Sequence, residues 1–215
     1  MTTPTQPLSV QPVTSKEIQT DPITYIALGA SDAVGVGTNQ PGSQGYVPLI
    51  AARLPSGSHM INLGISGIHL HDALSRELPL AISTSPQLIT IWLVANDFVT
   101  GVDYDHYMQD LDTLLQQLRA GTKARIVIGN LPDLSILPAF SNSSNDQKAE
   151  MYKEIVRWNK QIDVIAAHYQ AIVVDLLNKN NQLTTHPEYI SPDGFHPSPA
   201  GYVQLADFFW QAIIS

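Results

Sequence analysis

The sequence contains no cysteine and few basic residues, and each shortage excludes a class of function. Without cysteine there can be no disulfide, no thiolate metal site and no cysteine nucleophile. The 215 residues include 11 lysines and arginines against 19 acidic residues, which gives a net charge of −8, and the basic residues form no cluster. Because proteins bind nucleic acids largely through phosphate contacts, we expect no nucleic-acid partner.

Long hydrophobic runs are also missing. No apolar stretch approaches the roughly 20 residues of a membrane-spanning helix, and the first residues lack the basic start and apolar stretch of a secretory signal. Residues 1–21 are rich in Thr, Pro, Gln and Ser, which is typical of a disordered tail or a linker. As written, the sequence predicts a cytoplasmic protein. A signal or lipid-anchor segment ahead of this tract would instead indicate a secreted or cell-envelope protein.

The rest of the chain, residues 22–215, has the composition of one packed α/β domain, with 44% hydrophobic and 14% charged residues over the whole sequence. Short apolar runs ending at glycine or polar residues predict strands over 23–28, 59–63, 88–94, 125–129 and 171–175. Apolar residues at helical spacing predict helices over 45–54, 70–81, 104–118, 152–169 and 199–214. This alternation predicts a mostly parallel sheet of about five strands with helices on both faces.

Residues able to catalyse an acyl transfer follow the predicted strands or precede the last helix, where the loops of such a sheet form a site. A serine nucleophile needs a base, a group that orients the base, and donors for the oxyanion. Ser31 is the candidate nucleophile, His196 the base and Asp193 the orienting carboxylate. The backbone N–H groups of Ser31 and Gly67 and the side-chain amide of Asn96 are the candidate oxyanion donors.

Taken together, these segments resemble the SGNH hydrolases, the GDSL-type esterase and lipase family. Its four signature residues match Ser31, Gly67, Asn96 and His196, with Asp193 three residues before the histidine, and they occur in family order. The resemblance implies a flavodoxin-like three-layer α/β/α sandwich and a hydrolase with no cofactor. Its partner would be a small-molecule ester or acylated substrate.

Two positions depart from the family pattern. Aspartate usually precedes the serine, whereas this chain has Ala30 there and Asp32 after the serine. We hypothesise that Asp32 compensates by hydrogen-bonding nearby backbone. Glycine usually stands two residues before the third-block asparagine, whereas this chain has Val94, which is predicted to narrow the space above the oxyanion hole.

The substrate is left open. A carboxylester hydrolase for short to medium acyl chains is favoured, with a carbohydrate O-deacetylase, a lysophospholipase or a thioesterase as alternatives within the family. A non-catalytic flavodoxin-like binding module is the alternative of another class. Residues 131–140 carry several apolar side chains after a strand, and they form an acyl-binding wall, a mobile lid or an ordinary packed connection.

Other polar residues have simpler interpretations. Ser66 lies in a glycine-flanked segment, but the closing glycine of a nucleophile elbow is missing. The spacing of His69, His71 and Asp72 could suit a metal, yet nothing nearby completes a ligand set, so we expect solvated residues at a helix start and predict no metal. Asp97 is expected to hold the loop that positions the neighbouring asparagine.

Overall fold

The computed structural model describes residues 21–179 and 186–215, so the predicted tail lies outside the described residues except for its last residue. Five strands form one sheet in the order β2-β1-β3-β4-β5, and all four pairings are parallel. The predicted parallel sheet is therefore confirmed. The strands are β1 (Thr24–Gly29), β2 (His59–Asn62), β3 (Leu88–Trp92), β4 (Arg125–Gly129) and β5 (Ile172–Val174).

Burial explains why the central strands are continuous apolar runs. In β1, β3 and β4 nearly every residue is buried, because helices cover both faces of a parallel sheet. The register places Ile26 beside Ile89, and Ile89 beside Ile126, so that branched side chains pack across neighbouring strands. Strand β2 lies at the sheet edge and is exposed.

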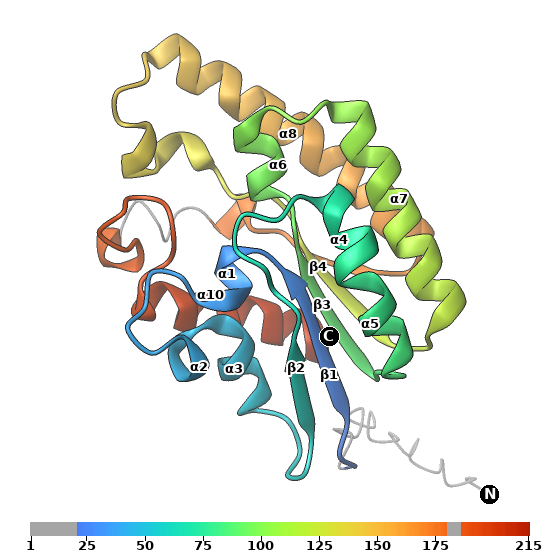
Figure 1. Ribbon diagram of the computed structural model, residues 1–215. Coiled ribbons are helices and arrows are strands. Elements are labelled where there is room, and N and C mark those ends of the chain that lie inside the picture. The colour runs from blue at the N-terminus through green and yellow to red at the C-terminus, as the bar shows by residue number, and fades with distance from the viewer. Residues whose placement is uncertain (1–20, 180–185) are drawn as a thin grey trace, which may run out of the picture.

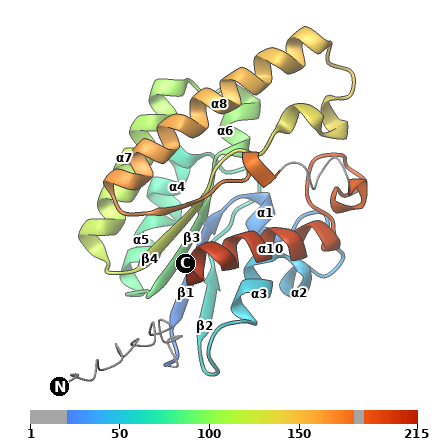
Figure 2. The same cartoon turned by 180° about the vertical axis from the view of Figure 1, so that it is seen from behind.

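Helices form a layer on each side of the sheet, as Figures 1 and 2 show. The layers together make the predicted three-layer α/β/α sandwich. No helix among the described residues is long and apolar enough to span a bilayer. One layer contains α4 (Leu70–Arg76), α5 (Leu78–Ser83), α7 (Tyr104–Gly121) and α8 (Asn145–His168), with short α6 (Ala95–Thr100) beside α8. The other layer contains α1 (Ser31–Val34), α2 (Pro41–Gln44), α3 (Tyr46–Ala51) and α10 (Pro199–Ile214). Short 3₁₀ helices are η1 (Leu134–Ile136), η2 (Pro138–Phe140), η3 (Leu177–Lys179) and η4 (Pro187–Tyr189).

Several predicted helix boundaries are wrong, for local reasons. The single helix predicted over 70–81 is two helices that meet at Glu77, because Pro79 in the first turn of α5 has no N–H to continue the first helix. Helix α8 begins well before residue 152, because Ser144 and Gln147 form a capping box. The helix predicted over 45–54 is shorter and is preceded by α2.

The strand order locates the site. In a sheet of order 2-1-3-4-5, the chain changes direction between β1 and β3, and ligands bind in the crevice outside the carboxyl ends of those strands. Only Ala30 separates Ser31 from the end of β1, and Asn96 lies in α6, the helix that follows β3. Two of the residues predicted from sequence therefore flank the crevice.

Candidate active site

Ser31 is held in a sharp turn between β1 and α1. It is the first residue of α1, and its exposed fraction is 7%. The turn is tight, because a Cβ at Gly29 would lie only 2.6 Å from the Cβ of Ala33. Since the first N–H groups of a helix have no partner within it, the backbone N–H of Ser31 is suited to bind an oxyanion.

The structure brings His196 and Asp193 to Ser31, although the histidine and serine are 165 residues apart in sequence. Nε2 of His196 lies 2.9 Å from Oγ of Ser31, and Nδ1 lies 2.7 Å from Oδ2 of Asp193. An ionised carboxylate can only accept, so Nδ1–H donates to Asp193 and Nε2 accepts from the serine hydroxyl. This tautomer is the one that a general base needs.

Asp193 is fixed by three further donors on its other oxygen. Oδ1 accepts from the Ser191 hydroxyl at 2.8 Å and from the backbone N–H groups of Phe195 at 2.8 Å and His196 at 3.0 Å. Partial burial alone would raise the pKa of Asp193, but these hydrogen bonds outweigh burial and hold it well below its usual range. The group is therefore a carboxylate throughout the neutral range.

A close approach between chain segments positions the 191–197 loop over Ser31. Gly37 has a φ of +97°, and a Cβ there would collide with the carbonyl oxygen of Pro197 and lie 3.2 Å from the Cβ of His196. On α10, the Tyr202 hydroxyl donates to the carbonyl of Val36 at 2.6 Å. These contacts tie the segment after α1 to α10 and hence to the histidine loop.

The other oxyanion candidates are Gly67, in the loop after β2, and Asn96, in the helix after β3. Gly67 is exposed and has a φ of +77°, a conformation that favours glycine. Nδ2 of Asn96 donates to the carbonyl of Ile68 at 3.0 Å, which ties the asparagine to the loop that contains Gly67. Since the amide carries two N–H groups, one stays available for a ligand.

Asp97 has the positioning role expected from its place beside Asn96. Its buried carboxylate accepts from the backbone N–H of Leu70 at 3.1 and 3.3 Å, and so joins the start of α4 to α6. Burial raises the pKa of Asp97 to about 6, with the Leu70 hydrogen bond opposing that rise. Asn96 and Asp97 therefore both anchor the end of the Gly67 loop that leads into α4.

Comparison with known proteins identifies the family. The model of the GDSL-like lipase/acylhydrolase family matches residues 27–204, which include most of the sheet and all five predicted site residues. The chain belongs to this family.

Relatives of this GDSL-family hydrolase include esterases. An acetylxylan esterase of Geobacillus stearothermophilus is 25% identical over 179 residues, covering 79% of this chain and 80% of the relative. The crystal structure of TesA has a TM-score of 0.71 at 23% identity and covers 88% of this chain and 97% of TesA. The acetyl xylan esterase AlAXEase has a TM-score of 0.70 at 20% identity, covering 89% of this chain and 100% of that protein. The solved structures agree with the fold described above.

The hypothesis that Asp32 compensates for Ala30 stays a prediction. Its side chain is 6% exposed, lies close to His196 and hydrogen-bonds the backbone of its own residue. Burial raises the pKa of Asp32 to about 6, although the charge of His196 acts in the opposite direction. Val94 is 1% exposed and packs in the core, and its effect on the oxyanion hole stays a prediction.

Glu77 supports the serine turn and was missed from the sequence. Its side chain is fully buried, and Oε2 accepts from the backbone N–H of Gly29 at 3.0 Å. Burial raises the pKa of Glu77 to about 8, which that hydrogen bond only partly offsets. Pro79 breaks the helix at Glu77, but nothing in the sequence indicates that this side chain reaches Gly29.

A mostly apolar cavity of about 90 Å³ lies beside the candidate catalytic residues. Asp32, Ala95 and Phe195, which line it, each adjoin a candidate site residue in sequence. The 131–140 segment contributes to its wall and packs on the histidine loop, since the N–H of Ala139 donates to the carbonyl of Gly194 at 3.1 Å. Further lining residues are Trp92, Pro132, Leu134, Leu137, Leu176, Ile190, Leu205 and Phe208.

Proposed function

We propose that this protein is a serine carboxylester hydrolase that acts through an acyl-enzyme on Ser31. The observation that carries the proposal is the unbroken hydrogen-bond chain from Asp193 through His196 to Ser31, at the switch point of the sheet. Family membership supports ester hydrolysis. The geometry of the hydrogen-bond chain supports these three residues as the catalytic triad of that reaction.

In the acylation step, Oγ of Ser31 bonds to the ester carbonyl carbon while its proton passes to Nε2 of His196. The N–H groups of Ser31 and Gly67 and the amide of Asn96 stabilise the oxyanion that forms. The C–O bond to the alcohol then breaks, and His196 gives its proton to the leaving oxygen. A water molecule then attacks the acyl carbon while His196 takes its proton. The bond from that carbon to Oγ of Ser31 breaks, Oγ recovers the proton from His196, and the acid is released.

The preferred acyl group is short. The cavity of about 90 Å³ is smaller than the roughly 150 Å³ cavity that holds benzene in an engineered protein, so it accommodates only a few carbon atoms. Its wall is apolar on the side of Leu134 and Leu137, which suits an acyl chain rather than a sugar. We assign this cavity to the acyl chain because Asp32, which lines it, is the residue next to Ser31.

A second candidate within the same chemistry is carbohydrate O-deacetylation. It is favoured by the acetylxylan esterase relative, which covers most of this chain. Both candidates share the acyl-enzyme, and they differ in the alcohol that leaves.

Two sets of assays test the proposal. Ser31→Ala should abolish hydrolysis of p-nitrophenyl acetate, whereas Ser66→Ala, a change at a nearby exposed serine, should retain it. Near-normal activity in Ser31→Ala together with loss in Ser66→Ala would overturn the assignment. Rates across p-nitrophenyl esters from acetate to palmitate, and acetate release from acetylated xylan, then distinguish the two candidates. A preference for long chains would contradict the cavity argument.

A further inference from the structure

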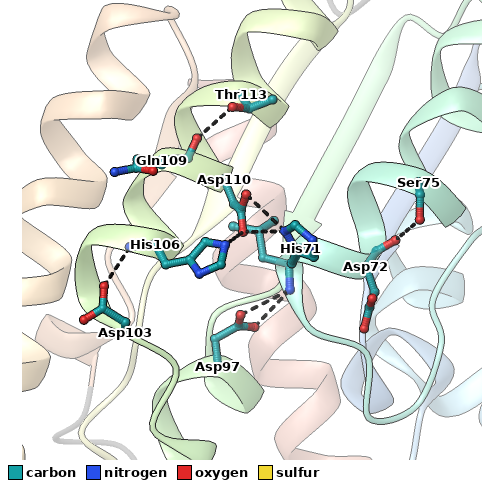
Figure 3. Close-up of polar contacts among 10 residues, drawn as sticks. His71, Asp72, Ser75, Asp97, Asp103, His106, Gln109, Asp110 and Thr113 are labelled. Atoms are coloured by element: carbon teal, nitrogen blue, oxygen red, sulfur yellow. Dashed lines mark hydrogen bonds and ion pairs between the residues drawn. The ribbon is translucent and has the colours of Figure 1, made fainter.

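A second group of chemically active side chains lies between α4 and α7, outside the candidate active site. His71 comes from the first turn of α4, and His106 and Asp110 lie one turn apart on α7 (Figure 3). The expectation that nothing near His71 could complete a metal-ligand set is therefore wrong. His69 and Asp72, considered with His71 from sequence, are not part of this group, since His69 bonds Thr100 instead.

The distances in the group match a tetrahedral metal site. Nδ1 of His71 lies 3.2 Å from Oδ2 of Asp110, and Nε2 of His106 lies 3.6 Å from the same oxygen. In a tetrahedral zinc site with bonds of about 2.0–2.2 Å, neighbouring ligand atoms lie about 3.3–3.6 Å apart. The His71–Asp110 separation also allows a hydrogen bond between the two side chains, which a bound Zn²⁺ would replace.

The ligands are presented from fixed positions and leave room for a water molecule. Leu70, next to His71, is held by Asp97, so the histidine projects from an anchored helix start. Asp110 is largely buried, with 13% of its side chain exposed, and it faces both rings. The two histidine side chains are 68% and 58% exposed, which leaves the fourth position of a tetrahedron open to solvent.

The surrounding charge favours a cation. Helix α7 and its cap carry four aspartates, Asp103, Asp105, Asp110 and Asp112, against a single basic residue, Arg119, in the last turn. Two imidazoles and a carboxylate are typical ligands of Zn²⁺, whereas Mg²⁺ and Ca²⁺ prefer oxygen alone. We propose that His71, His106 and Asp110 form a Zn²⁺ site that links α4 to α7.

Such a site exists only in the folded chain, because its ligands come from two helices that are distant in sequence. Zinc binding would therefore stabilise the folded state. At a free Zn²⁺ concentration about 100 times the Kd, the melting temperature of a chain of this size should rise by about 5–10 °C.

The test uses the full chain, freed of metal by a chelator and then titrated with ZnCl₂ in a calorimeter. We expect one Zn²⁺ per chain. Loss of a residue that only hydrogen-bonds a metal ligand typically weakens metal binding by about 10–100-fold. His71→Ala and His106→Ala each remove a ligand itself, so each should weaken zinc binding by more than that. His168→Ala, at an exposed histidine at the end of α8, is the matched control and should bind as the wild type does.

Melting curves provide the second measurement. Without zinc, the three variants should melt close to the wild type, and only the wild type and His168→Ala should gain stability on adding ZnCl₂. Three results would each overturn the proposal: no zinc binding by the wild type, unchanged zinc binding by both His71→Ala and His106→Ala, or an equal rise of the melting temperature with MgCl₂. Because none of these readouts depends on ester hydrolysis, failure of the zinc site leaves the proposed enzymatic function unaffected.

Discussion

Replacing Glu77 by glutamine should change how the stability of the protein depends on pH. The folded carboxyl holds its proton up to a pKa of about 8, whereas an ordinary glutamate loses its proton above 4.5. Between these values unfolding releases a proton, so rising pH favours the unfolded chain. The stabilisation of the protonated group is complete below pH 4.5 and is lost as the pH passes through about 8.

The magnitude follows from the width of this window. Each pH unit within it changes the free energy of unfolding by about 1.4 kcal/mol, so this group can remove up to about 4 kcal/mol between pH 5 and pH 8. Glutamine preserves an acceptor for the N–H of Gly29 but does not ionise. Glu77→Gln should therefore match the wild type at pH 5 within about 1 kcal/mol and exceed it by about 3–4 kcal/mol at pH 8.

Urea denaturation of both proteins at pH 5 and pH 8 measures this difference. Other titrating groups, such as Asp97 and Asp193, contribute equally to both proteins and cancel in the comparison. Parallel loss of stability in the wild type and in Glu77→Gln would refute the assignment of a buried, protonated carboxyl beneath the serine turn.

Three further predictions concern the site. Asn96→Ala should lower kcat for p-nitrophenyl acetate by about 10²–10³-fold, as expected for loss of one oxyanion donor; a loss under threefold would remove Asn96 from the oxyanion hole. Asp32→Asn should lower kcat by about tenfold at pH 8, because it removes a negative charge near His196 in a partly desolvated site. This difference should shrink below the Asp32 pKa of about 6, and a pH-independent difference would contradict a charge effect. Leu137→Ala should enlarge the cavity and raise the rate ratio of octanoate to acetate esters; an unchanged ratio would exclude this cavity as the acyl site.

The sequence was sufficient to predict those parts of the fold that depend on local pattern. Strand β4 and helix α10 have the predicted bounds, because apolar runs and a proline at a helix start are local signals. The break between α4 and α5 also has a local cause, Pro79, but the apolar spacing around it is continuous and predicts one helix. Helix α8 was predicted too short because its first turns are polar and its start depends on a side-chain cap.

In the candidate site, too, local sequence patterns predict some residues, whereas contacts between distant elements escape prediction. Ser31, Asp193 and His196 could be proposed together because each occurs in a recognisable segment at the end of a predicted element. The contact of Glu77 with Gly29 and the approach of His71 to Asp110 could not, because each joins residues of different elements through the packing of helices. The role suggested for Asp32 stays a prediction, because the orientation of a side chain in a short helix is not encoded in its position alone.

The most direct test of the central claim is intact-mass spectrometry after exposure to a fluorophosphonate probe, followed by peptide mapping. A serine nucleophile activated by His196 should take up one probe molecule, located on Ser31. Ser31→Ala should take up none, and Ser66→Ala should react as the wild type does. An unlabelled wild type, or an adduct that persists in Ser31→Ala, would contradict the claim that Ser31 is the nucleophile of this hydrolase.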